Sequence, residues 1–127
     1  SICPENVAFQ IGDMKWWLQA NTMSLVITEG HHTYVFGLDT VLTLYTAIEC
    51  DALGDMVGPD PEPKLFTRGE FVLNRTGDHV VMHDNEGYRL GLSVRELREL
   101  IRHISEAFAQ PAWQTLVVRY RELMGDL

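Results

Sequence analysis

The sequence predicts an α+β domain in which one antiparallel sheet of about six to seven strands is covered on one face by two to three amphipathic helices. Three observations lead to this prediction. Short segments of alternating apolar and polar residues recur, joined by turns rich in Gly, Asp and Asn. Residues 93–108 have the apolar spacing of a helix. The chain has 127 residues, 46% of them hydrophobic, which suits one globular domain over 1–127.

Two hairpins are expected at the start. In VAFQIGDMKWWLQ, Gly12-Asp13 is a two-residue turn. It places apolar residues opposite one another on one face, since side chains alternate along a strand; the pairs are Ile11 with Met14, Phe9 with Trp16, and Val7 with Leu18. MSLVIT and HTYVFGL form the second pair, with the turn at Glu29-Gly30. Tyr34 and Phe36 join its core face if the loop has two residues.

The segment DTVLTLYTAIECDAL, residues 39–53, fits two structures. As a helix it begins at Asp39 as N-cap and has an apolar stripe, which is Val41, Leu44, Tyr45 and Ile48, and a stripe of threonines at 40, 43 and 46. As a strand, its β-branched residues and partial alternation also fit. We favour the helix. The proline-rich GDMVGPDPEPK that follows is expected to be a connector.

The second half is expected to form three strands and two helices. GEFVLNRTGDHVVMHDNEGYRLGL supplies the strands, and Ser93 with Glu96 forms a capping box that starts the next helix. Pro111 suits the first position of a last helix. The predicted order is therefore ββββα–βββαα. Aligning Gly37 with Gly91 places Asp39 on Ser93, which suggests an internal ββα duplication over 23–54 and 79–108.

The charge is negative and uneven. The net charge is −8, and residues 1–63 hold nine acids and one base. This surplus disfavours nucleic acid, whose phosphates need clustered Lys and Arg, and it favours a basic protein partner. The candidate partner-binding acids are Glu49, Asp51, Asp55, Asp60 and Glu62. The same acids also serve solubility.

The expected compartment is the cytoplasm. Two cysteines do not make a disulfide framework, and free thiols are typical of reducing compartments. No apolar run is long enough to span a bilayer, and the first residues lack a signal-peptide pattern. We therefore expect no membrane association.

No motif for nucleotide binding, zinc binding or serine hydrolysis occurs in the chain. His79 and His83 share one strand face, but at about 3.3 Å per residue they lie about 13 Å apart, too far to bind one ion. We expect no catalytic residue, metal or cofactor.

The most informative residue for function is Trp17. If Trp16 faces the core, Trp17 lies on the opposite face of the sheet with Ala8, and an exposed indole is a frequent interface anchor. The leading hypothesis is therefore a non-enzymatic protein-interaction module, such as an inhibitor, an immunity protein or a chaperone, that uses Trp17 and the acidic first half. A homodimer is expected.

Two alternatives stay open. The first is a small enzyme or ligand-binding domain whose pocket, between sheet and helices, is lined by Tyr34, His83, Tyr88 and Arg89. The second is a single-stranded nucleic-acid binder. Residues 87–108, strands followed by a helix that begins Gly-Leu-Ser, resemble the plan of small coactivator-type single-strand binders, which implies base stacking on outward aromatics.

Overall fold

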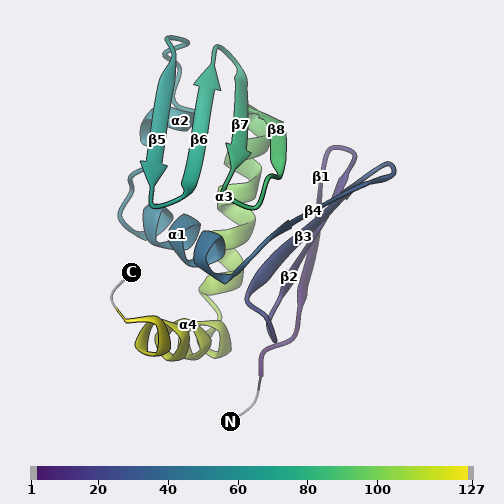
Figure 1. Ribbon diagram of the computed structural model, residues 1–127, viewed down its shortest axis with the longest axis vertical. Helices are drawn as coiled ribbons and strands as arrows, with labels where there is room; N and C mark the ends of the chain where they lie inside the picture. Colours follow the sequence, from purple (N-terminus) through teal and green to yellow (C-terminus); the bar gives the residue numbers. More distant parts are fainter. Residues whose placement is uncertain (1–2, 126–127) are drawn as a thin grey trace.

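The computed structural model describes residues 3–125, in which two four-stranded antiparallel sheets and four helices are arranged as Figure 1 shows. Sheet A is a meander of β1 (Val7–Ile11), β2 (Met14–Gln19), β3 (Ser24–Glu29) and β4 (His32–Phe36). Sheet B is a meander of β5 (Lys64–Arg68), β6 (Phe71–Thr76), β7 (His79–His83) and β8 (Arg89–Ser93). The helices are α1 (Leu38–Glu49), the short α2 (Gly54–Val57), α3 (Val94–Phe108) and α4 (Pro111–Met124).

The α+β class and the antiparallel pairing are confirmed, and the single sheet of six to seven strands is wrong. The helices α1 and α2 and a proline-rich connector separate β4 from β5, so these two strands cannot form a hairpin. The strand β5 was not predicted from the sequence because it directly follows the prolines and has little apolar alternation. Only one of its large apolar side chains, Phe66, lies on the inner face of the sheet, where it pairs with Leu73. Its other apolar residue, Leu65, is 65% exposed.

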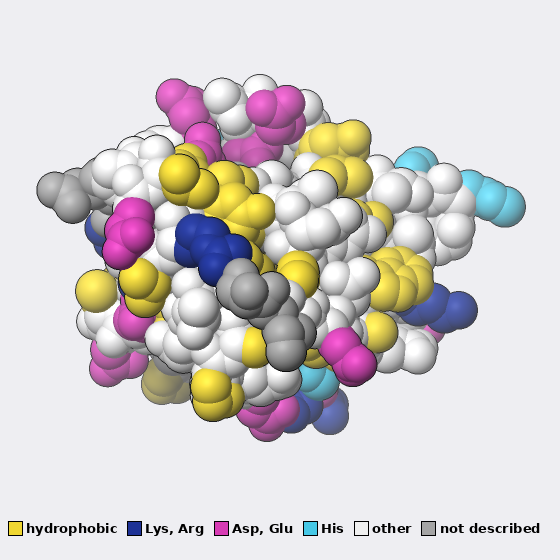
Figure 2. All heavy atoms as spheres, turned by 90° about the horizontal axis from the view of Figure 1, so that it is seen from below, with side chains coloured by type: hydrophobic (Ala, Val, Ile, Leu, Met, Phe, Trp, Pro, Cys, Tyr) yellow, Lys and Arg dark blue, Asp and Glu magenta, His cyan; other side chains and the backbone are white. Residues whose placement is uncertain are grey.

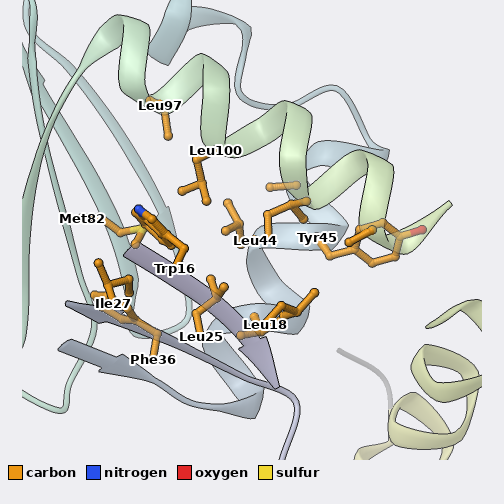
Figure 3. Close-up of a cluster of buried hydrophobic side chains, with 14 of the residues drawn as sticks. Trp16, Leu18, Leu25, Ile27, Phe36, Leu44, Tyr45, Met82, Leu97 and Leu100 are labelled. Carbon is orange, nitrogen blue, oxygen red and sulfur yellow. The ribbon is translucent and has the colours of Figure 1, made fainter. Parts of the chain in front are cut away.

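Two of the helices, α1 and α3, lie against both sheets rather than on one face of a single sheet. The helix α1 contacts β3 and β6, while α3 contacts β1, β7 and β8. Figure 3 shows the resulting core, where Trp16 of sheet A and Met82 of sheet B meet Leu100 of α3. All three side chains are fully buried. One shared core therefore joins the two halves.

The first hairpin has the predicted register, with Ile11 paired to Met14 across Gly12, whose φ is +57°. In the second, Glu29 pairs with His32, so the loop has two residues and Tyr34 lies opposite Ile27 on the predicted face. Trp16 is fully buried and Trp17 is half-buried opposite Ala8. The pattern of alternation therefore placed the two indoles on opposite faces correctly.

The ambiguous segment is helical, as favoured, but its N-cap is Gly37 and not Asp39. Asp39 lies in the first turn and makes no capping hydrogen bond. The capping box of α3 is present: the amide of Glu96 donates to Ser93 Oγ at 3.0 Å, and the amide of Ser93 donates to the Glu96 carboxylate at 2.8 Å.

Each half of the chain is a four-stranded meander followed by a helix. Aligning the N-caps, Gly37 and Ser93, superimposes the helix stripes without a shift; the pairs are Val41 with Leu97, Leu44 with Leu100, and Ile48 with Ile104. The alignment of Gly37 with Gly91 is wrong, since Gly91 lies inside β8. A common origin of the two halves stays a prediction.

Two arginines hold α2 in place. The buried Arg75 of β6 donates from Nη1 to the carbonyl oxygens of Asp55 (3.0 Å) and Gly58 (2.7 Å). Arg98 of α3 donates to the carbonyl oxygen of Val57 at 2.7 and 3.0 Å. The last carbonyl groups of a helix have no partner within it, so these guanidinium groups act as its C-terminal cap.

Candidate functional site

An apolar row crosses the outer face of sheet A, the face turned away from the helices. The pairing places Ala8 of β1, Trp17 of β2, Val26 of β3 and Val35 of β4 side by side. All four are at least partly exposed, and Val35 is 37% exposed. We call these four residues the outer row. Figure 1 shows α1, α3 and α4 all on the other side of sheet A.

A shallow hollow of about 280 Å³ lies beside Trp17, between β1 and β2. Ala8, Gln10 and Lys15 line it together with the indole. Sheet A therefore presents an aromatic ring beside a shallow depression on its open face, and aromatic side chains are enriched at protein interfaces.

The corresponding row of sheet B differs. The residues at the same positions are Leu65, Asn74, Val81 and Gly91. Asn74 stands where sheet A has Trp17, and the His79 ring lies so close to Gly91 that a Cβ there would be 2.9 Å from it. Sheet B therefore offers no aromatic anchor at this position, and the two open faces are not equivalent.

The acidic residues lie elsewhere. Glu49 at the end of α1 pairs with Arg121 of α4 at 2.7 Å, and Asp60 pairs with Lys64 at 2.8 Å. Hydrogen bonds from the Lys64 ammonium and the Glu62 amide lower the pKa of Asp60. Asp51, Asp55 and Glu62 are exposed, and no ion pair joins them to another described residue.

The structure does not bring these five acids together with Trp17. They belong to the end of α1, to α2 and to the connector before β5, on the far side of the core from sheet A (Figure 1). On the face seen from below, the visible acidic side chains lie at several places along the edge (Figure 2). The aromatic and the acidic candidates are therefore separate surfaces.

The four residues of the alternative pocket also separate. The rings of Tyr34 and Tyr88 lie 6.3 Å apart, between the two sheets, and Tyr88 is also 6.3 Å from Phe36. His83 and Arg89 face each other across β7 and β8 on the outer face of sheet B. The two tyrosines therefore contact each other, while His83 and Arg89 lie on the outer face of sheet B.

A cavity of about 330 Å³ opens instead between α1 and the turn that joins β5 to β6. Most of the residues that line it have polar or charged side chains, although more of the lining surface is apolar; they are Asp39, Thr40, Thr43, Thr46, Arg68, Gly69, Glu70, Phe71 and Asn85. We call it the threonine cavity. The threonine stripe was visible in the sequence, but nothing in the sequence places the Arg68–Glu70 turn opposite it.

Arg121 is a residue that the sequence did not single out. Its guanidinium lies 5.5 Å from the centre of the Tyr45 ring and donates to Thr46 Oγ1 at 2.8 Å and to Glu49. Three contacts to one face of α1 show that this arginine docks α4 on α1. Its role in the structure is to position the last helix.

No group of three or more His, Cys, Asp or Glu side chains within residues 3–125 is arranged to hold a metal ion. No helix in that range is long and apolar enough to cross a membrane. Fold and surface together define a class, a two-sheet α+β domain with an open, aromatic sheet face. Protein-family models, curated protein sequences and solved structures gave no match to this chain.

Proposed function

We propose that the protein is an interaction module that binds a protein partner through the outer face of sheet A. The observation that carries this proposal is Trp17, a half-buried indole in a second strand, beside a hollow and flanked by Ala8 and Val26. Tryptophan is enriched among residues that dominate binding energy, because a rigid ring buries a large area at a low entropy cost.

The size of this face limits what the outer row can do alone. Sheet A has four strands of five or six residues. With strands about 4.8 Å apart and about 3.3 Å per residue, its open face covers roughly 300 Å². A stable complex buries about 800 Å² on each partner. The partner must therefore also contact surfaces beside the sheet, such as its hairpin turns, with Trp17 near the centre.

The acidic surplus supports a basic partner. Its contribution is long-range attraction that speeds association, because the acids of 49–62 lie away from the outer row. Such a field repels nucleic-acid phosphates, so we do not propose a nucleic-acid partner. A second copy of this chain is the alternative occupant of the outer row, and the cytoplasm is the compartment we propose.

The test compares Trp17→Ala with Asn74→Ala, its counterpart in sheet B. Partners captured by the wild-type chain are identified and purified, and their affinities are measured at two salt concentrations. Loss of a centrally placed tryptophan is expected to weaken binding by about 2 kcal/mol, or roughly 30-fold. Asn74→Ala should bind as the wild type does. If the chain is a dimer, Trp17→Ala should sediment as a monomer.

Circular dichroism must show that both variants are folded. If Trp17→Ala is folded and keeps both its oligomeric state and every purified interaction of the wild type, the outer row is not the binding surface and the proposal is wrong.

A further inference from the structure

We propose that the threonine cavity is a binding site for a small basic amino acid, a molecule that carries two cationic groups and one carboxylate. This inference is independent of the outer row and goes beyond the proposed interaction. The cavity volume, about 330 Å³, is at the small end of the range of ligand sites.

The charges that line the cavity select the ligand. Two carboxylates, Asp39 and Glu70, and one guanidinium, Arg68, face the space. A basic amino acid has the complementary set. It has one cationic group for each of the two carboxylates, and its own carboxylate can accept two parallel hydrogen bonds from the guanidinium. The net charge of −8 on the whole chain also attracts a cationic ligand.

Polar groups of the wall are held in place by contacts behind them. Thr40 Oγ1 donates to the buried carboxylate of Asp84 at 2.7 Å, and Thr46 Oγ1 accepts from Arg121 at 2.8 Å. Thr43 lies between them on the same stripe, and its hydroxyl makes no hydrogen bond to a described residue. A wall fixed in advance reduces the entropy cost of binding, and Thr43 can donate to the ligand carboxylate.

Other ligand classes fit less well. The N-terminus of α1 would attract an anion, but Asp39 and Asp84 already place carboxylates there. A neutral polyol would form no ion pair with the three exposed charged groups of the wall. An amino acid with an acidic side chain would bring a second carboxylate toward Asp39 and Glu70 and would be repelled.

The test is a titration of the folded full chain with lysine, arginine and glutamate, followed by backbone amide chemical shifts. Lysine or arginine should shift the amides of 39–46 and 68–70, with dissociation constants near 1 mM or below, and glutamate should not. Glu70→Gln and Arg68→Gln lie at an exposed turn and should fold, and each should weaken binding at least about 10-fold, the effect of losing one charged hydrogen bond.

Glu29→Gln, which removes an exposed carboxylate at the remote β3–β4 turn, is the matched control and should bind as the wild type does. The proposal is overturned if lysine and arginine cause no shifts up to about 10 mM, beyond the weakest useful affinities. It is equally overturned if glutamate or a neutral polyol binds as well as lysine, or if Glu70→Gln binds as tightly as the wild type.

Discussion

Arg75 is the residue whose replacement tests the structure most directly. It is only 4% exposed and stands in β6 at the position that the fully buried Leu18 occupies in β2. Sequence alternation alone would place a leucine there. The contacts of Arg75 explain why an arginine is buried here: its guanidinium donates hydrogen bonds to the carbonyl oxygens of Gly77, Asp55 and Gly58. We predict that Arg75→Met destabilises the fold and releases α2.

The magnitude follows from these contacts. The Gly77 carbonyl lies in an open turn and can bind water after the substitution, so its loss costs little. The bonds to Asp55 and Gly58 join a charged donor to backbone acceptors, and each such bond contributes about 1.5–3 kcal/mol. Part of this is offset because a buried guanidinium no longer has to be desolvated. We expect a net loss of about 2–4 kcal/mol of unfolding free energy.

Urea denaturation measures the total, and amide hydrogen exchange locates it. The amides of 54–60 should lose protection more than those of β1 and β2. Arg98→Met removes two exposed hydrogen bonds to one acceptor, the Val57 carbonyl, and should cost about 1 kcal/mol or less because water can replace them. A loss below about 0.5 kcal/mol for Arg75→Met, typical of a neutral surface change, would refute the idea that this arginine holds α2.

Two further predictions concern α3. Ser93→Ala removes a capping hydrogen bond and should lower the unfolding free energy by about 1 kcal/mol. Asp39→Ala, at the first turn of α1, removes no capping bond and should lower the unfolding free energy by at most about 0.5 kcal/mol. Urea titration measures both changes. Burial, and then the neighbouring Arg102, lower the pKa of His103, whose ring stacks on Phe9 at 4.3 Å. The stability contributed by neutral His103 is complete above about pH 6.5 and is lost as the pH falls through its folded pKa.

His103→Phe is the control for the second prediction, because it keeps the stack on Phe9 and removes the titrating group. Its unfolding free energy should fall less between pH 7 and pH 5 than that of the wild type. Equal pH dependence of the two proteins would show that His103 does not titrate differently in the folded state. For the first prediction, equal losses from Ser93→Ala and Asp39→Ala would contradict the difference in capping.

The parts of the fold that were predictable are those that short-range physics determines. The Gly12-Asp13 turn fixed the first hairpin register, the capping box fixed the start of α3, and alternation separated Trp16 from Trp17. The candidate residue Trp17 followed from the same rule. Each of these features depends on residues only a few positions apart in the chain.

The features that were not predictable depend on distant contacts. The helix α2 has four residues, begins with glycine and lacks a side-chain cap. Its contacts come from Arg75 and Arg98, which lie many residues later in the chain. The threonine cavity likewise needs the Arg68–Glu70 turn beside α1, and division into two sheets depends on α1 and α3 each contacting both of them. Local periodicity carries no information about such pairings.

Because both halves of the chain have the same topology, residues at equivalent positions of the two sheets and helices can be compared. Where the two halves must bury a shared core they match in apolar character, as in the stripes that begin with Val41 and Leu97. They differ at Leu18 and Arg75, where only the second half has to hold α2, and at Trp17 and Asn74, where neither side chain is needed for the core. The difference between Leu18 and Arg75 at a core position has a structural cause, because Arg75 binds carbonyl oxygens of α2 and its C-cap. The difference on the open face has no such cause in the described residues, and this is why we propose a role in binding for Trp17.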